Sequence, residues 1–186
     1  MKDEKAVIDY YHTKESRWGY SLVLRGTKHF GYYPQNKTKI SMGRALDNMS
    51  DKLGKSIGLK AGSKVLDAGC GQGSTAARLA QKFGYKVEGI DLLDFGIEHA
   101  KKRRTTKVLK DRLRFQVGSY NNLPFKDNYF DAVHTMETLV HSPDYKKTLR
   151  QLRRVLKPGG KLVMFEYSMP AQSDMSEKER KVFGII

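Results

Sequence analysis

The sequence contains little cysteine, little proline and no long hydrophobic run. Its one cysteine, Cys70, can form neither an internal disulfide nor a zinc cluster by itself, which indicates a reducing, cytoplasmic setting. Apolar stretches such as residues 162–165 are far shorter than the roughly 20 residues that span a bilayer. The first five residues carry mixed charge and lead into no apolar segment, so we expect no secretory signal.

Acidic residues are also fewer than basic residues. The 186 residues include 35 Lys and Arg but only 20 Asp and Glu, a net charge of +15. Such a balance fits nucleic acid, an anionic membrane surface, an acidic ligand or solubility alone. The hydrophobic fraction of 39% is enough to build a core, and the length fits one soluble domain.

From about residue 60, apolar runs alternate with helical patterns. This alternation predicts an α/β fold, a Rossmann-like, doubly wound and mainly parallel sheet with helices on both faces. The expected strands are 64–67, 87–91, 113–117, 129–134 and 161–167, and the expected helices are 74–83, 95–104 and 145–156, the last closed by residues 157–160. Residues 1–59 are then a helical and aromatic lid segment, 60–168 the ligand-binding core and 169–186 a tail.

A glycine-rich turn follows the first strand. In such sheets, ligands bind where the first strand turns into its helix. Glycines at 69, 71 and 73 permit positive φ and leave room for a ligand on the backbone. Asp91 ends the second strand, 18 residues after Gly73, where an acid commonly accepts hydrogen bonds from ribose hydroxyls. Turn, helix and acid together predict a nucleotide-type ligand.

Two ligand classes compete for this turn. A dinucleotide site prefers G-x-G-x-x-G, whereas this chain has G-x-G-x-G with Asp67 two residues before the first glycine. A carboxylate there repels a pyrophosphate and suits the ammonium group of S-adenosylmethionine, which carries no phosphate. The alternative is that Asp67 only caps a turn.

Residues 65–73 resemble motif I of the class I S-adenosylmethionine-dependent methyltransferases, and the similarity continues through 89–91, 123–125, 130–133 and 156–162. The resemblance implies that S-adenosylmethionine is the cofactor and that no metal is needed. The methionine part would lie along the glycine turn, the ribose at Asp91 and the adenine near Ser119. The implied cofactor-binding residues are Asp67, Gly69, Cys70, Gly71, Gln72, Gly73, Asp91, Leu92, Ser119 and Tyr120.

One position departs from the family pattern. Many relatives carry an acid after the glycine of the third strand, where it accepts from the adenine amino group. Here Gly118 is followed by Ser119. A hydroxyl can still accept that bond, so we expect cofactor binding to survive, in a weaker form.

The segment after the fourth strand bears on the methyl acceptor. It lacks the Asn/Asp-Pro-Pro-Tyr/Phe tetrapeptide of enzymes that methylate exocyclic amines of nucleic-acid bases. The spacing of Glu137, His141 and Pro143 resembles the sterol 24-C-methyltransferases and related small-molecule methyltransferases. That resemblance implies catalytic roles for Glu137 and His141. The alternative is that His141 caps a loop and Glu137 pairs with a surface base.

Aromatic residues are concentrated near the N-terminus. Seven of the 19 aromatic side chains lie within the first 33 residues: Tyr10, Tyr11, Trp18, Tyr20, Phe30, Tyr32 and Tyr33. They can shield an apolar acceptor and favour a cation, and segments 18–20 and 29–33 loosely resemble the lid of the sterol-type enzymes. Packing of a lid helix on the sheet explains them equally well.

The positive charge falls into two clusters. Residues 101–120 hold eight bases and one acid, and residues 146–161 hold seven bases and no acid. The helices that carry them should lie on opposite faces, so they form no single nucleic-acid groove. A solvated face is the first explanation, attraction to an anionic membrane the second and RNA the third.

The family analogy implies seven strands, yet only 19 residues follow Tyr167, with a helix expected over 176–183. We therefore expect the last strands to be lacking and the fifth strand to be an exposed apolar edge. We expect a second chain or dimer to cover it, or the polypeptide to be part of a longer protein. The favoured function is methylation of a small, largely apolar acceptor by a cytoplasmic, or peripherally membrane-bound, enzyme. An RNA methyltransferase and a non-catalytic cofactor-binding subunit are the alternatives.

Overall fold

The computed structural model describes residues 4–12, 27, 29–35, 39–166 and 176–177. Trp18, Tyr20, Tyr167 and most of the helix expected over 176–183 lie outside these residues. In the part of the chain that the structure describes, no helix is both long and apolar enough to span a membrane.

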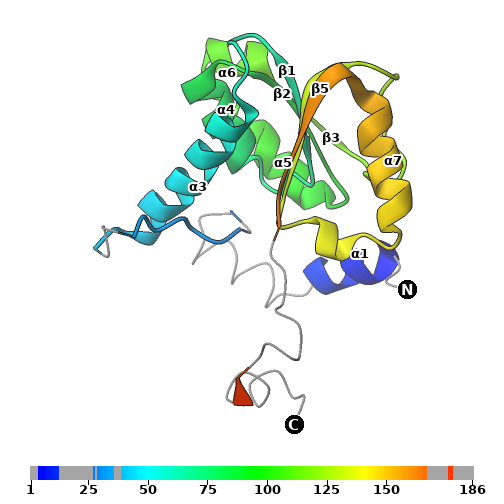
Figure 1. Ribbon diagram of the computed structural model, residues 1–186, viewed down its shortest axis with the longest axis horizontal. Coiled ribbons are helices and arrows are strands. Elements are labelled where there is room, and N and C mark those ends of the chain that lie inside the picture. Colours follow the sequence, from blue (N-terminus) through cyan, green and yellow to red (C-terminus); the bar gives the residue numbers. More distant parts are fainter. Residues whose placement is uncertain (1–3, 13–26, 28, 36–38, 167–175, 178–186) are drawn as a thin grey trace.

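A five-stranded parallel sheet with strand order β3-β2-β1-β4-β5 forms the centre of the molecule (Figure 1). The strands are β1 (Lys64–Ala68), β2 (Lys86–Asp91), β3 (Leu113–Val117), β4 (Phe130–Met136) and β5 (Leu156–Phe165). Their order reverses between β1 and β4, which is the point where doubly wound sheets bind their ligands. The predicted fold class is confirmed.

Helices cover both faces of the sheet. On one side of it lie α3 (Met42–Ile57), α4 (Ser74–Phe83), α5 (Asp94–Lys102) and α6 (Lys107–Arg112), and on the other side lies α7 (Tyr145–Val155). The sequence patterns gave no residue bounds for two of these helices, α3 and α6. Because α5 and α6 are separated from α7 by the sheet, the two basic clusters lie on opposite faces, as expected.

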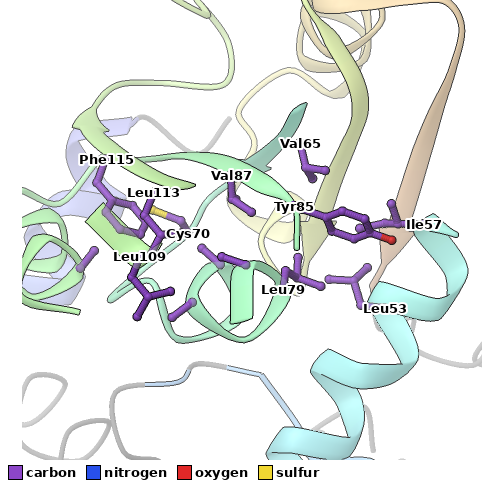
Figure 2. Packing of buried hydrophobic residues seen from close by; sticks show 14 of the residues in the cluster. Leu53, Ile57, Val65, Cys70, Leu79, Tyr85, Val87, Leu109, Leu113 and Phe115 are labelled. Atoms are coloured by element: carbon purple, nitrogen blue, oxygen red, sulfur yellow. The ribbon is translucent and has the colours of Figure 1, made fainter. Parts of the chain in front are cut away.

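Alternating side chains of the strands supply the two halves of the core. Val65 and Val87 pack toward α3 and α4, whereas Leu66 and Ile90 pack toward α7. Figure 2 shows the first half, in which the ring of Tyr85 lies beside α3. The Tyr85 hydroxyl donates to the carbonyl of Gly54 at 3.2 Å and accepts from the N–H of Leu59 at 3.2 Å. This buried pair of bonds fixes α3 against β2.

The start of β5 differs from the prediction. The helix ends at Val155 and the strand begins at Leu156, so residues 157–160 lie within β5 rather than in a separate turn. Phe130 pairs with Leu156 and Ala132 with Lys161, so the register shifts there. Pro158 has no N–H to donate and Gly159 has a φ of 72°, so this stretch bulges out of the ladder without ending the strand.

Helix α1 (Glu4–His12) lies at the edge of the sheet where the strands end (Figure 1). Its residues Val7 and Tyr11 pack against Leu93, which precedes α5. The N-terminal segment therefore covers the carboxyl ends of the strands, where the ligand site is expected.

Candidate functional site

A cavity of about 800 Å³, including its open mouth, lies at the carboxyl ends of β1, β2 and β4. Most of the residues expected to bind the cofactor or act in catalysis line it, but Gln72, Gly73 and Ser119 do not. The expected residues that line it are Asp67, Gly69, Cys70, Gly71, Asp91, Leu92, Tyr120, Glu137 and His141.

The glycine turn forms the floor of the cavity. The N–H groups of Gly69 and Cys70 both donate to the carbonyl of Ile90, at 2.9 and 2.8 Å, which ties the turn to β2. Gly69 has a φ of 92°, and a Cβ there would lie 2.2 Å from Oγ1 of Thr138. At Gly71, with a φ of 51°, a Cβ would meet no atom within 4 Å. Gly69 is thus required by packing, and Gly71 leaves space for a ligand.

Asp67 is a buried carboxyl without a compensating charge. Its Oδ2 has no hydrogen-bond partner among the described residues. The Nε2 atom of His134 lies 3.7 Å from its Oδ1, too far for a hydrogen bond. Burial lowers the pKa of His134 to about 3, so that ring is neutral. Burial, and then the charge of Asp91, raise the pKa of Asp67 to about 8. A cationic ligand group would satisfy this carboxyl.

Asp91 is held in place by the backbone. Its Oδ2 accepts from the N–H of Gly71 at 2.8 Å, and its Oδ1 accepts from the N–H of Leu93 at 3.0 Å. Each oxygen uses one lone pair in this way and keeps further capacity to accept. The carboxylate is therefore fixed in place at the cavity and can still accept hydrogen bonds from a ligand.

The cavity continues from Asp91 toward the loop after β3. Leu92, Leu93, Gly118 and Tyr120 line this part. Burial is the main cause that raises the pKa of Tyr120, and its hydroxyl donates to the carbonyl of Thr138 at 3.1 Å. This mainly apolar slot has the kind of lining that binds small ligands such as a nucleobase.

Glu137 follows β4 in an unusual backbone conformation. Its φ is 52°, in the left-handed region that non-glycine residues seldom adopt, and its N–H donates to the carbonyl of Phe165 at 2.7 Å. The carboxylate accepts from the N–H of Phe30 at 3.0 and 3.1 Å, and among the described residues it pairs with no basic side chain. Burial, and then the charge of Glu166, raise the pKa of Glu137. Strain of this kind is typical of functional positions.

His141 ends the short 3-10 helix η1 (Leu139–His141). Its Nε2 shares a hydrogen bond of 2.9 Å with the hydroxyl of Tyr11, and the two rings meet edge to face with centroids 5.4 Å apart. Both side chains line the cavity. The N-terminal region therefore contacts both candidate catalytic residues, Glu137 through Phe30 and His141 through Tyr11.

Several lining residues were missed by the sequence analysis. They come from α1, from the segment around His29, from the start of α4 and from the ends of β3 and β4: Val7, Thr27, His29, Ser74, Thr75, Leu93, Gly118, Met136 and Thr138. Tyr11 was noted only as one of the N-terminal aromatics. The spacing of Val7 and Tyr11 on one helical face was the available signal.

The charges of the cavity decide between the two ligand classes. Three lining residues carry carboxyl groups, Asp67, Asp91 and Glu137, and no Lys or Arg belongs to the described lining. Such a cavity favours a cation and disfavours a pyrophosphate. In the described part of the chain, no group of three His, Cys, Asp or Glu side chains is placed to hold a metal ion.

A protein-family model described as a methyltransferase domain matches residues 59–185. The S-adenosyl-L-methionine-dependent Diels-Alderase iccD of Talaromyces variabilis is 34% identical over 182 residues, which cover 96% of this chain and 62% of that protein. The sterol 24-C-methyltransferase ERG6B of Gibberella zeae is 36% identical over 141 residues, which cover 76% of this chain and 37% of that protein. The crystal structure of the cyclase SpnF superimposes with a TM-score of 0.77 and 30% identity, covering 86% of this chain and 59% of that one. The chain thus spans between 37% and 62% of the length of these relatives.

Proposed function

Because the chain belongs to the class I S-adenosylmethionine-dependent methyltransferases, we propose that its cavity binds S-adenosylmethionine and that the protein methylates a small, largely apolar acceptor. The observation that carries this proposal is the buried carboxyl of Asp67, whose Oδ2 has no partner among the described residues, in a cavity whose described lining has no Lys or Arg. It fits the ammonium group at the methionine end of the cofactor. A dinucleotide would bring a pyrophosphate to the same place.

The chain's own residues hold the cofactor in three parts. Asp67 accepts from the ammonium, the carboxylate of Asp91 accepts from the ribose hydroxyls, and the apolar slot beside Leu92 and Tyr120 takes the adenine. When bound, S-adenosylmethionine would supply a methyl group on a sulfonium: the acceptor would form a bond to the methyl carbon in line with the breaking carbon–sulfur bond, and S-adenosylhomocysteine would leave as a neutral thioether. The protein must align the acceptor and exclude water.

Glu137 and His141 line the cavity beside their contacts with Phe30 and Tyr11. The raised pKa of Glu137 makes its carboxylate a better base than an exposed one. The hydrogen bond between Tyr11 and His141 positions an imidazole and a phenol beside the same space. We propose that Glu137 takes or holds a proton and that His141 orients the acceptor. The sterol 24-C-methyltransferase relative supports an isoprenoid-like carbon as acceptor, with an oxygen or nitrogen of a small metabolite as the alternative.

A second candidate function is S-adenosylmethionine-dependent cyclisation without methyl transfer. It is favoured by the named Diels-Alderase, which matches 96% of this chain, and by the cyclase SpnF with its TM-score of 0.77. In that case the cavity would hold the cofactor in place while the lid segment folds a polyene substrate. A cycloaddition changes neither the mass of the substrate nor the cofactor.

The test is to incubate the protein with methyl-labelled S-adenosylmethionine and a panel of sterols, phenols, amines, polyenes and RNA. Methyl transfer to a small acceptor, lost in Glu137→Gln while cofactor binding persists in calorimetry, supports the proposal. An isomer of unchanged mass and unconsumed cofactor favours the cyclase. Labelled RNA, or activity that appears only after mixing with another protein, favours the RNA enzyme or the non-catalytic subunit. No binding of S-adenosylmethionine refutes the assignment altogether.

We also propose that the outer face of α7 makes peripheral contact with an anionic membrane. Tyr145 and Leu149, one turn apart, are 52% and 40% exposed. They are surrounded by exposed bases at 146, 147, 150 and 153, a combination typical of helices that lie on lipid surfaces. Sedimentation with vesicles containing phosphatidylserine, but not with pure phosphatidylcholine, is the expected result. Equal sedimentation with both would contradict it.

We further propose that a second copy of the chain covers the open side of β5. This strand is the last in the sheet as described, and Met164 on it is 47% exposed. An uncovered apolar edge promotes association. Sedimentation equilibrium should show a dimer at micromolar concentration, and a monomer throughout would overturn this proposal.

A further inference from the structure

Glu4, the first residue of α1, reaches the loop after β3. Its Oε1 accepts from Oγ of Ser119 at 2.5 Å and from Nδ2 of Asn121 at 2.9 Å. These partners lie 115 and 117 residues away in the sequence. The N-terminal helix therefore brings a carboxylate to Ser119. This is the position at which many relatives carry an acid.

This carboxylate lies beside the cavity rather than in its lining: its partner Ser119 sits between Gly118 and Tyr120, which line it. Glu4, Val7 and Tyr11 are spaced by three and four residues, so they share one face of α1. Val7 and Tyr11 both line the cavity, and Glu4 lies one turn before Val7. The charge of Glu4 is also one of the smaller causes that raise the pKa of Tyr120, a residue that lines the cavity.

The orientation of the cofactor follows from the two acids already described. With the ammonium at Asp67 and the ribose at Asp91, the base must lie beyond Asp91, against Leu92 and the loop after β3. Adenine presents an exocyclic amino group, which is a donor. An acceptor on that loop would therefore select adenine over a base that carries an oxygen at the same position.

Ser119 by itself is poorly suited to this role. Its single proton is donated to Glu4, and its oxygen already accepts from the N–H of Asn121 at 3.0 Å. Glu4 has four acceptor sites in its carboxylate, and the bonds to Ser119 and Asn121 both end on Oε1. We propose that Glu4 is the adenine-selecting residue of this protein: its carboxylate, held by Ser119 and Asn121, accepts from the 6-amino group.

This inference rests on the proposed function, since it assumes that the cavity takes S-adenosylmethionine. It adds that α1 forms part of the cofactor site. Cofactor binding and docking of α1 then stabilise each other by the same factor, because coupling between two binding events is reciprocal.

The experiment compares the affinities for S-adenosylhomocysteine and for its 6-oxo analogue, S-inosylhomocysteine, by calorimetry. We expect the unchanged protein to prefer the amino compound by about tenfold or more, since one hydrogen bond is made and one lone-pair repulsion avoided. Glu4→Gln should bring the ratio close to one, because an amide can donate to the oxo group. Glu98→Gln, which changes an exposed acid on α5, is the matched control and should leave the ratio unchanged.

A rescue separates recognition from anchoring of the helix. If Glu4 only anchored α1, its loss would weaken the binding of both ligands equally, and the ratio of the two affinities would not change. Ser119→Asp in the Glu4→Gln background should restore the preference for the amino compound. In the presence of Glu4 the same aspartate should weaken binding, because two carboxylates would then meet. Hydrogen exchange of residues 4–12 checks that the helix stays docked.

The outcomes separate this inference from the proposed function. Binding of S-adenosylhomocysteine with an unchanged ratio in Glu4→Gln overturns the role of Glu4 and leaves the proposed function standing. Absence of binding to the unchanged protein overturns both.

Discussion

Protonation of Asp67 should govern how tightly this protein binds its cofactor. Its pKa is about 8 in the ligand-free cavity, against an ordinary value of 3.8, chiefly because the carboxyl is fully buried. At pH 7 only about a tenth of the molecules then carry the carboxylate that an ammonium requires. Ionising the protonated carboxyl at pH 7 costs about 1.4 kcal/mol, which lowers the affinity for the cofactor about tenfold.

The affinity for S-adenosylmethionine should therefore rise about tenfold between pH 6 and pH 7 and reach a maximum near pH 8. Above that it should fall, because an α-amino group has an ordinary pKa of about 8 and loses its own charge. At pH 7 Asp67 should release about 0.9 proton on binding and the ligand amino group should take up about 0.1, a net release of about 0.8 proton. Calorimetry in phosphate and in Tris, whose heats of ionisation differ, measures this release directly.

Asp67→Asn is the informative variant, and Asp111→Asn, an exposed acid outside the cavity, is its control. The first should bind weakly without proton release, and the second should behave as the unchanged protein. A carboxyl whose pKa is raised on folding stabilises the folded protein at pH values below its ordinary pKa, and this stabilisation is lost as the pH rises through 8. Asp67→Asn should thus raise the melting temperature of the ligand-free protein at pH 9 more than at pH 4. An affinity that is flat from pH 6 to pH 8, with heats independent of buffer, would refute the reasoning.

Two further predictions concern the turn and the fold. Gly71→Ala should lower cofactor affinity more than tenfold and stability by only about 1 kcal/mol, because its Cβ meets no protein atom. Gly73→Ala should cost about 3 kcal/mol of stability, because its Cβ would lie 2.9 Å from the Phe115 ring. Urea unfolding measures the stability of both variants and calorimetry their cofactor affinity, and a larger loss of stability in Gly71→Ala than in Gly73→Ala would contradict the prediction. Arg78 donates to both oxygens of Asp51 at 2.8 and 3.0 Å and lowers its pKa. Asp51→Asn should thus cost about 1 kcal/mol at pH 7 and nothing near pH 2, and an equal cost at both would contradict the ion pair.

The strands and the glycine turn were predictable because their signals are local. Alternating apolar residues in 113–117 and the glycines at 69, 71 and 73 restrict the backbone within a few residues of themselves. The handedness of the connections limits the possible strand orders, but only the structure gives the order β3-β2-β1-β4-β5. The start of β5 was not predictable in this way. Proline and two glycines commonly end an element, and only pairing with β4 keeps residues 157–160 in the strand.

The candidate site was predictable in part. Asp67, Asp91 and the turn lie close together because neighbouring parallel strands end at one edge. The contacts of Glu137 with Phe30 and of His141 with Tyr11 span 107 and 130 residues. No periodicity in the chain can reveal contacts over such separations.

The sequence by itself determined the α/β class, the family and the glycine turn that lines the cavity, since each depends on residues that are neighbours along the chain. Only the tertiary structure decided how charged the cavity is and which residues close it. It buried Asp67 without a counter-ion and so raised its pKa to about 8. It also placed Glu4 in contact with Ser119, which lies 115 residues away in the sequence. Burial and long-range proximity arise from packing, which a local pattern does not contain.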